Sequence, residues 1–193
     1  MGNPDLETIL REDLSMAIQS KMFDDFLDSA GAANTNPVQG ILPLITNNTA
    51  LAVKDLTTAE KMWTLSKLES VVEKLFISYK ANEMMARWIF SAKDKFLLRQ
   101  SLKTSADTAS NFLWEKDNSV CGYPAMGTNN LTDVGIIGDF RESYVATFGA
   151  MELATGYKAD DFVRGITTLR AIMPWDVGVR RVAAFQKMTL DRS

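Results

Sequence analysis

The stretches VGIIGDF (residues 134–140) and GITTLRAIMPWDVGVRRVAAFQKMTL (residues 165–190) carry the strand pattern that decides the fold of this chain. Gly135–Phe140 is a short apolar run of the kind that forms a buried strand beside a loop. In Gly165–Met173, odd- and even-numbered side chains fall on opposite faces, as the two-residue period of a strand requires. Only the tripeptide PWD separates that segment from Val177–Leu190, so the two segments are predicted to form a β-hairpin.

Upstream of these stretches, the pattern changes between strand and helix. Val120–Ala125 indicates a turn that enters a strand, and Trp88–Phe90 indicates another strand. A helix over Ser91–Leu102 is predicted next, because Ser91 can act as its N-cap and Asp94 complements the positive end of the helix dipole.

Two longer helices are predicted nearer the N-terminus, over Asp5–Ser29 and Thr58–Tyr79. The apolar side of the first helix changes direction along its length, which predicts contacts with two different surfaces and makes Leu10 and Phe26 expected core positions. The second helix has apolar residues at three- and four-residue spacing, so it is predicted to face a core above a sheet.

Thr57 and Glu60 form a capping-box pattern at the start of the second helix. Between the two helices, Gly40–Val53 predicts a turn and short extended segments, and Ala106–Trp114 predicts a loop that leads into a short strand. The sequence therefore predicts an α+β fold in which helices flank a central mixed sheet.

The order of these motifs resembles the C-terminal part of the major capsid proteins of tailed bacteriophages and prophages, the Hong Kong 97-like coat-protein family. The resemblance rests on the tripeptide Gly122-Tyr123-Pro124, the tripeptide Gly138-Asp139-Phe140 and the dipeptide Ala184-Phe185. The stretch GAANTNPVQGIL, residues 31–42, is similar to the turn after that family's spine helix. One departure is the dipeptide Ser91-Ala92, which stands where the family has Asn-Pro.

The resemblance implies a division of the chain into three parts. Residues 1–35 would be the spine helix of a peripheral lobe, residues 36–160 an axial α/β lobe, and residues 161–193 a terminal hairpin that returns to the peripheral lobe. It also implies that the N-terminal arm and the extended loop of complete subunits are missing from this chain, so that the chain alone is expected to be a monomer or a small oligomer.

The function implied by the resemblance is structural. Copies of the complete subunit would assemble through pentamers and hexamers into an icosahedral shell around DNA, without sequence-specific contact to that DNA. The protein would be made in the cytoplasm of a bacterial host and would end in the virion capsid. A second interpretation with the same fold is the shell protein of an encapsulin nanocompartment, which encloses cargo enzymes.

A small α+β enzyme or ligand-binding domain is the alternative from another class of function. The chain has no histidine, which removes the commonest general base and metal ligand. The single cysteine, Cys121, is interpreted as a small half-buried residue beside a turn. We therefore expect no catalytic residue, no cofactor site and no metal site.

The charge balance argues against a protein that reads nucleic acid. There are 21 basic and 24 acidic residues, with a net charge of −3, whereas a nucleic-acid binder normally carries a basic patch. We expect the arginines of the predicted hairpin to pair with carboxylates of neighbouring subunits or to lie on a solvated face, and the tip tryptophan to mark an interface. These five candidate contact residues are Arg164, Arg170, Trp175, Arg180 and Arg181. No apolar run is long enough for a transmembrane helix, so no membrane partner is expected.

Overall fold

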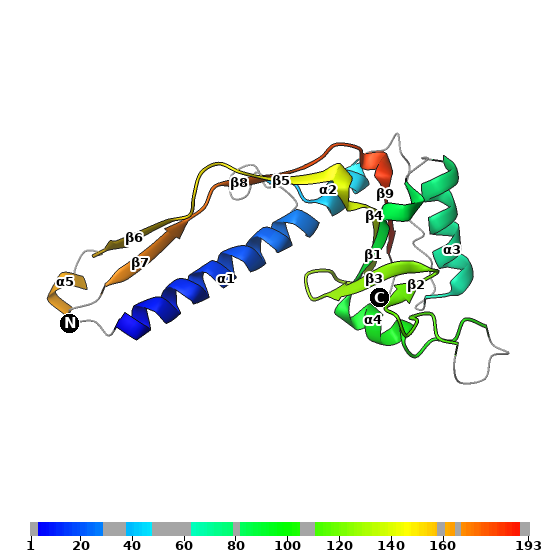
Figure 1. The fold of residues 1–193 in the computed structure, drawn as a ribbon, viewed down its shortest axis with the longest axis horizontal. Helices are drawn as coiled ribbons and strands as arrows, with labels where there is room; N and C mark the ends of the chain where they lie inside the picture. The colour runs from blue at the N-terminus through cyan, green and yellow to red at the C-terminus, as the bar shows by residue number, and fades with distance from the viewer. Residues whose placement is uncertain are drawn as a thin grey trace.

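A five-stranded mixed sheet forms the core of the larger part of the molecule (Figure 1). The computed structural model describes residues 4–28, 38–47, 63–78, 82–104, 111–157, 161–164 and 167–189. The strands of the sheet lie in the order β2-β3-β1-β4-β9. Their bounds are Ala86–Ser91 for β1, Ser119–Val120 for β2, Tyr123–Thr128 for β3, Val134–Asp139 for β4 and Phe185–Thr189 for β9.

Strand β1 occupies the centre of this sheet. It runs parallel to β3, with Trp88 beside Ala125, and antiparallel to β4, with Trp88 opposite Ile137. Strand β4 pairs antiparallel with β9 on its other edge. The predicted pairing of the two apolar strand segments in one sheet is therefore confirmed.

Alternate side chains of β1 enter two different cores, as the two-residue period requires. Trp88 and Phe90 are fully buried on one face, where their rings stack at 4.9 Å. Helix α3 (Leu65–Glu73), continued by the π-helical turn η2 (Lys74–Ser78), covers that face with Leu68 and Leu75. Ile89 points to the other face.

The second face is covered by helices α1 (Pro4–Asp28) and α2 (Ile41–Asn47). The core there contains Leu27 of α1, Ile41 and Ile45 of α2, and Ile136 of β4, all at most 1% exposed. The prediction of turns and extended segments over Gly40–Val53 was wrong for residues 41–47, because Ile41 and Ile45 lie one helical turn apart and are buried together. Pro43 does not prevent this helix, since it stands within the first turn.

The helix predicted over Thr58–Tyr79 begins later than expected. Thr64 is the N-cap residue of α3, and Trp63 before it is not helical. Trp63 is 2% exposed and donates its indole N–H to the buried carboxylate of Asp94 at 2.8 Å, so the chain is fixed against the sheet before the helix starts. The proposed capping box and residues 58–62 lie outside the described residues.

Helix α4 (Ala92–Leu98) begins as predicted. The hydroxyl of Ser91 accepts a hydrogen bond from the backbone N–H of Asp94 at 3.0 Å and donates one to its carboxylate at 2.5 Å. The helix ends at Leu98 and not at Leu102, because Leu102 forms a β-bridge with Phe112.

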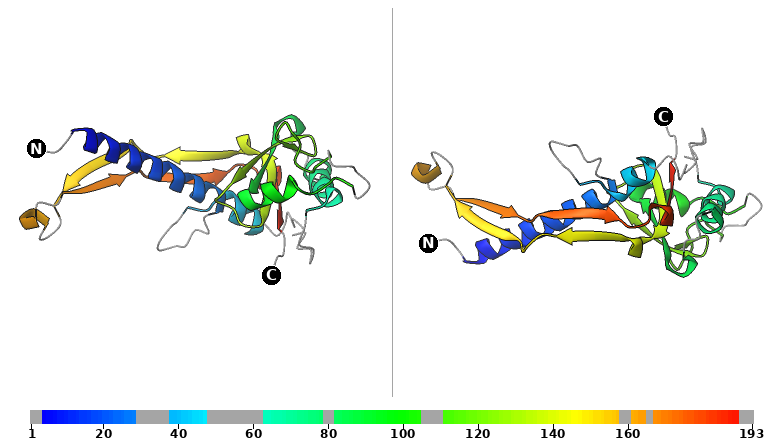
Figure 2. Two further views of the ribbon diagram at one scale, coloured as in Figure 1. Left: turned by 90° about the horizontal axis from the view of Figure 1, so that it is seen from below. Right: turned by 90° about the horizontal axis from the view of Figure 1, so that it is seen from above.

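A long two-stranded ribbon leaves the sheet on the same side as α1 (Figures 1 and 2). Strands β5 (Ser143–Thr147) and β8 (Trp175–Val179) form its near half. Strands β6 (Glu152–Gly156) and β7 (Thr168–Ile172) form its far half, which ends near the short helix α5 (Asp161–Arg164).

The predicted hairpin between residues 165–173 and 177–190 was therefore wrong. Strands β7 and β8 follow each other along one side of the ribbon, and each pairs with an earlier segment of the chain. The interruption at Pro174 does not reverse the chain, since the Pro174 carbonyl accepts a hydrogen bond from the N–H of Phe148 across the ribbon at 2.9 Å. After Arg181, the turn η5 (Val182–Ala184) leads into β9.

The part of the chain that the structure describes contains no helix that is both long enough and apolar enough to span a membrane. The architecture of the described residues is the predicted α+β arrangement, in which a long helix and shorter helices surround a central mixed sheet. The division at residues 35 and 160 stays a prediction.

Candidate functional site

The three motifs that suggested a family in the sequence lie at turns and strand junctions of the sheet. Cys121 and Gly122 are the two turn residues between β2 and β3, and both have positive φ, 51° and 79°. This is the pattern of a type I′ hairpin turn, in which glycine is favoured. Tyr123 and Pro124 then begin β3, the strand that pairs with β1.

The other two motifs are in contact with each other. Gly138 lies opposite Phe185 in the β4–β9 ladder, and the Phe140 ring packs edge-on against the Phe185 ring at 5.3 Å. Phe185 and Ala184 are buried. The sequence motifs Gly138-Asp139-Phe140 and Ala184-Phe185 thus form one junction. At this junction the chain passes between the strands of the sheet and the strands of the ribbon.

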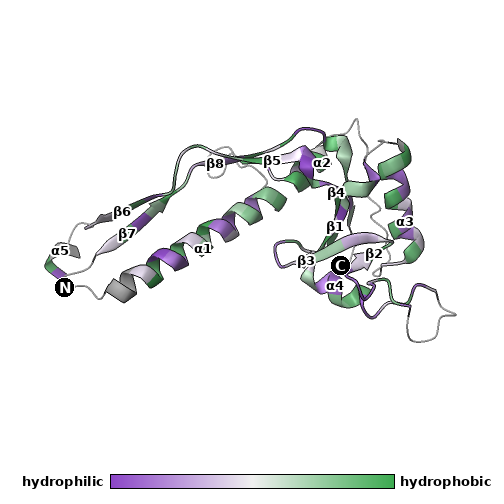
Figure 3. Ribbon diagram, viewed as in Figure 1, coloured by the Kyte–Doolittle hydropathy of each residue, from purple (hydrophilic) through white to green (hydrophobic). Residues whose placement is uncertain are grey.

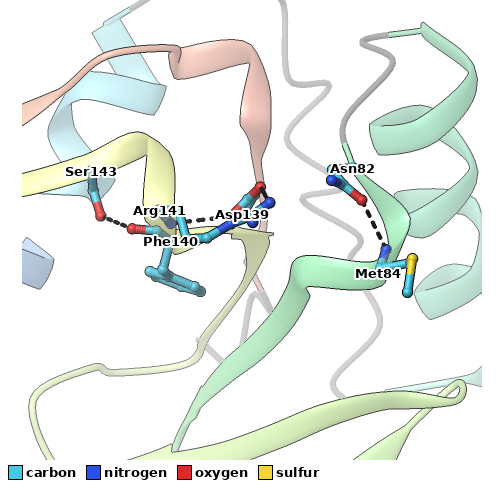
Figure 4. Close-up of polar contacts among 6 residues, drawn as sticks. All are labelled: Asn82, Met84, Asp139, Phe140, Arg141 and Ser143. Carbon is cyan, nitrogen blue, oxygen red and sulfur yellow. Dashed lines mark hydrogen bonds and ion pairs between the residues drawn. The ribbon is translucent and has the colours of Figure 1, made fainter.

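The Asp139 side chain caps the turn that follows β4 (Figure 4). Its carboxylate accepts hydrogen bonds from the backbone N–H and the Nε of Arg141, both at 3.1 Å, and from a terminal guanidinium nitrogen at 2.8 Å. Hydrogen bonding to Arg141 lowers the pKa of Asp139. The Ser143 hydroxyl donates to the Phe140 carbonyl at 2.6 Å, so the chain turns tightly before it enters β5.

Figure 4 shows a second small cap on the other side of this junction. The Asn82 side chain accepts a hydrogen bond from the Met84 N–H at 3.2 Å at the start of the turn η3 (Glu83–Met85), which precedes β1. Met84 itself is 88% exposed. Both strands at the centre of the sheet therefore have a local side-chain cap at this end.

Cys121 is half-buried, as predicted, and it lies within the turn itself and not beside it. Burial, reinforced by the nearby Glu69 carboxylate, raises the pKa of its thiol to about 11. A thiol in that state is a poor nucleophile at neutral pH. Among the described residues, no group of three or more histidine, cysteine, aspartate or glutamate side chains lies close enough to hold a metal ion.

The structure spreads the five predicted contact residues along the ribbon and its base. Arg164 is in α5 and Arg170 is in β7, while Arg180 and Arg181 follow β8, and all four arginines are exposed. The structure brings only the adjacent Arg180 and Arg181 close together. No ion pair joins any of the four to another described residue.

Trp175 does not occupy a hairpin tip. It begins β8, lies opposite Thr147 and is half-buried. Its indole N–H is buried with no hydrogen-bond acceptor among the described residues. The prediction of an exposed tip was wrong because the chain continues through Pro174 without reversing.

The sequence did not predict two apolar surfaces that the structure exposes. Met22, Phe23 and Phe26 of α1 and Val145 of β5 line a groove of about 350 Å³ between the helix and the ribbon, together with Gln19. Further towards its N-terminus, α1 leaves Ile9 and Met16 exposed at 54% and 59%. Purple and green segments alternate along this helix, so polar and apolar side chains are interleaved there (Figure 3).

Helical periodicity could have indicated the second surface. Ile9 and Met16 are seven residues apart and so lie on one side of the helix. Their exposure follows only from the three-dimensional structure, because the sheet covers α1 near its C-terminal end alone.

These features belong to a chain whose sequence matches the model of the phage capsid family over residues 3–190. No curated protein sequence matches the chain.

Solved structures similar to the chain have low sequence identity. The capsid of an empty GTA particle is 18% identical, with a TM-score of 0.70 over 96% of this chain and 66% of that one. A structure from Gordonia phage Cozz is 16% identical, with a TM-score of 0.63 over 98% of this chain and 64% of that one. The holo-SrpI encapsulin complex from Synechococcus elongatus PCC 7942 is 12% identical, with a TM-score of 0.58 over 93% of this chain and 65% of that one.

The chain thus spans 64–66% of the length of these three proteins. The similarity confirms the predicted fold with its long helix and central mixed sheet. At such low sequence identities, structural similarity is evidence for the fold alone and not for the function.

Proposed function

The chain belongs to the phage capsid family, and on that premise we propose that it is a major capsid subunit of a tailed phage or prophage. Copies of the complete protein associate edge to edge into pentamers and hexamers, which close an icosahedral shell around DNA. The work is mechanical, and it needs neither a catalytic residue nor a cofactor. The protein is made in the bacterial cytoplasm and resides in the virion capsid.

The observation that carries this proposal is the family match over residues 3–190. It is supported by the shape of the molecule, in which α1 and the ribbon extend away from the sheet on one side (Figure 2). An extended subunit exposes much side-chain surface relative to its core, as repeated subunit contacts require. The division into a spine helix (residues 1–35), an axial lobe (36–160) and a returning segment (161–193) belongs to the same proposal.

The enclosed DNA is held without sequence-specific contacts. The net charge of −3 supports this, because a protein that reads DNA neutralises phosphates with a basic patch. We assign the exposed arginines to contacts between subunits, and membranes have no part in the proposal.

An encapsulin-type shell is the second candidate, favoured by the similarity to the encapsulin complex. The two candidates share a fold and differ in what the shell encloses. The family match favours the phage subunit. A small α+β enzyme or ligand-binding domain is less well supported, since the apolar groove between α1 and the ribbon brings together no group of catalytic side chains.

Electron microscopy of the full-length gene product, expressed in bacteria, tests the proposal. We expect closed shells of uniform size, with DNA in particles from a complete phage or prophage. Particles that hold a cargo enzyme would favour the encapsulin, and a protein that never forms closed particles would contradict both shell functions.

A further inference from the structure

The two halves of the ribbon are separated by a mismatch in their strand register. The pairs that face each other across this gap are Thr147–Trp175 in the near half and Glu152–Ile172 in the far half. Four residues on one strand therefore lie opposite only two on the other, which is a β-bulge with two extra residues. The residues concerned are 148–151 and 173–174, and we call them the bulge.

The bulge bends the ribbon without turning its faces over. Odd-numbered residues pair with odd-numbered residues in both halves, for example Val145 with Val177 and Leu153 with Ala171. An insertion of one residue would turn the side chains of one strand to the other face, whereas an insertion of two keeps the alternation. A bulged strand bends, and the ribbon changes direction between its two halves (Figure 1). The bulge therefore sets the direction of the far half.

The backbone is weakly connected across the bulge. The N–H of Phe148 donates a hydrogen bond to the carbonyl of Pro174 at 2.9 Å. A hydrogen-bonded pair in an antiparallel ladder exchanges two such bonds, but proline has no N–H with which to return the second. Among the described residues, no second backbone hydrogen bond joins the two sides of the bulge. The ribbon therefore resists bending less here than in either ladder.

Two side chains of the bulge region favour a change of angle. Gly149 has a φ of 108°, and an added Cβ atom there would meet no atom within 4 Å, so its backbone has the conformational freedom of glycine and open space around it. The indole N–H of Trp175 is buried with no hydrogen-bond acceptor among the described residues. An unmade hydrogen bond is costly, so a bend that brings this group to water or to an acceptor is stabilised.

The two sides of the bulge differ in how firmly they are attached to the molecule. In the near half, Val145 lines the groove with Phe23 and Phe26 of α1. Val177 is only 7% exposed, and Val179 packs against the core that α2 covers. In the far half, most side chains of β6 and β7 are exposed. One side of the bulge is thus anchored to the body of the molecule, and the other side has far fewer contacts.

We propose that the bulge is a hinge about which the far half of the ribbon changes its direction relative to α1 and the near half. A hinge of this kind concentrates the change of backbone angles in a few residues. Its role rests on the proposed function, because pentamers and hexamers have different rotational symmetry and place neighbouring subunits at different angles. The hinge lets one amino-acid sequence fit both surroundings while each half keeps its own ladder.

Distances between two nitroxide labels, measured by double electron–electron resonance on the unassembled protein, test the hinge. Labels on Thr155→Cys and Asp176→Cys span the bulge, in a chain that also carries Cys121→Ser. Labels on Arg99→Cys and Asp176→Cys span the sheet and the near half, and they provide the reference. We expect the distance distribution across the bulge to be at least about twice as wide as the reference. Equal widths in the wild-type ribbon would overturn the hinge.

A straightened variant provides the second test. Deletion of Gly149 and Ala150 makes the two sides of the bulge equal in length, and Pro174→Val in the same chain restores the missing donor. The labels across the bulge should then give a distribution as narrow as the reference. Ala154→Val, at an exposed position of β6, is the control and should keep the wild-type width. A straightened variant as broad as wild type, or a control narrowed equally, would overturn the hinge. If the straightened variant does not fold, the comparison of the two label pairs in the wild-type ribbon still decides.

Electron microscopy of the full-length protein separates the hinge from the proposed function. We expect closed particles from wild type and open or irregular assemblies from the straightened variant. Closed particles formed equally well by both would overturn the role of the hinge in assembly and leave the shell function standing. A distance distribution that narrows on straightening, with no closed particles from either protein, would support the hinge and contradict the shell.

Discussion

Gly138 illustrates how one residue without a side chain permits the junction between sheet and ribbon. A Cβ atom at this position would lie 2.3 Å from Cδ1 of Phe185 and 2.6 Å from the backbone oxygen of Ala184. Phe185 is fully buried, and the Ala184 oxygen is a backbone atom of the turn η5 directly before β9, so neither neighbour can easily move aside. We expect Gly138→Ala to lower the free energy of unfolding by about 1–3 kcal/mol, measured by urea denaturation.

Gly156 provides the matched control for that substitution. It also lies in a strand, but no atom would come within 4 Å of an added Cβ. Gly156→Ala should change stability by less than about 0.5 kcal/mol. Equal losses in the two variants would contradict the steric explanation at Gly138.

Arg141 makes the stability of this junction depend on pH. Its hydrogen bonds lower the pKa of Asp139 in the folded protein, so the carboxylate contributes stability above the unfolded pKa and loses it as the pH falls through the folded pKa. Arg141→Ala should therefore lower the urea midpoint at pH 7, and the difference from wild type should shrink as the pH falls below 3.8. Urea titrations at several pH values measure this, with Arg99→Ala as a control that should show no such trend.

At the scale of elements, α1 is a helix with a buried end and an exposed end. Leu27 is fully buried against the sheet, whereas Leu10 is 40% exposed, so the expectation that Leu10 is a core position was wrong. Leu27→Ala should lower the free energy of unfolding by about 2–5 kcal/mol, and Leu10→Ala by less than about 1 kcal/mol. Thermal unfolding of both variants checks this, and equal destabilisation would show that both ends are core.

Local signals made some elements predictable. At Ser91 the two-residue period of β1 gives way to a helix with its own cap, and both features are encoded in neighbouring residues. The start of α4 and the pairing partners β1 and β4 were therefore predicted correctly. The extra helix α2 was missed because its helical signal is a single buried pair, Ile41 and Ile45, next to a proline.

The partners of β7 and β8 could not be read from the sequence. A period of two shows that a segment is a strand and which side chains share a face, and it correctly predicted that Thr168, Arg170 and Ile172 lie together on one face. It does not show which other strand completes the ladder. The true partners, β5 and β6, are largely exposed, so they lack the clean apolar alternation that identifies a strand.

The candidate contact residues were likewise predictable only in part. The exposure of Arg170 follows from its place in an alternating strand, while the position of Trp175 depended on a chain reversal that does not occur. The exposed apolar side of α1 with Ile9 and Met16 was missed because these side chains differ from core residues only in what covers them. Such information lies in the tertiary structure and not in the periodicity.

The whole molecule combines a sheet with two covered faces and an extension with far fewer contacts. Strands β1 and β4 each pair on both edges and lie between two cores. Among the described residues, strands β6 and β7 pair only with each other, and most of their side chains are exposed. Isolated two-stranded ribbons are only marginally stable in water, so the far half of the ribbon depends on further contacts to become rigid.

Amide hydrogen exchange of the unassembled protein should reveal this difference. We expect the amides of β1 and β4 to exchange at least roughly 100-fold more slowly than those of β6 and β7, because the sheet opens only on global unfolding whereas the ribbon opens locally. In assembled particles, protection should rise in the ribbon and along the N-terminal half of α1 while the sheet changes little. If β6 and β7 were already as protected as β1 before assembly, the ribbon would be rigid by itself and assembly would not be what orders it.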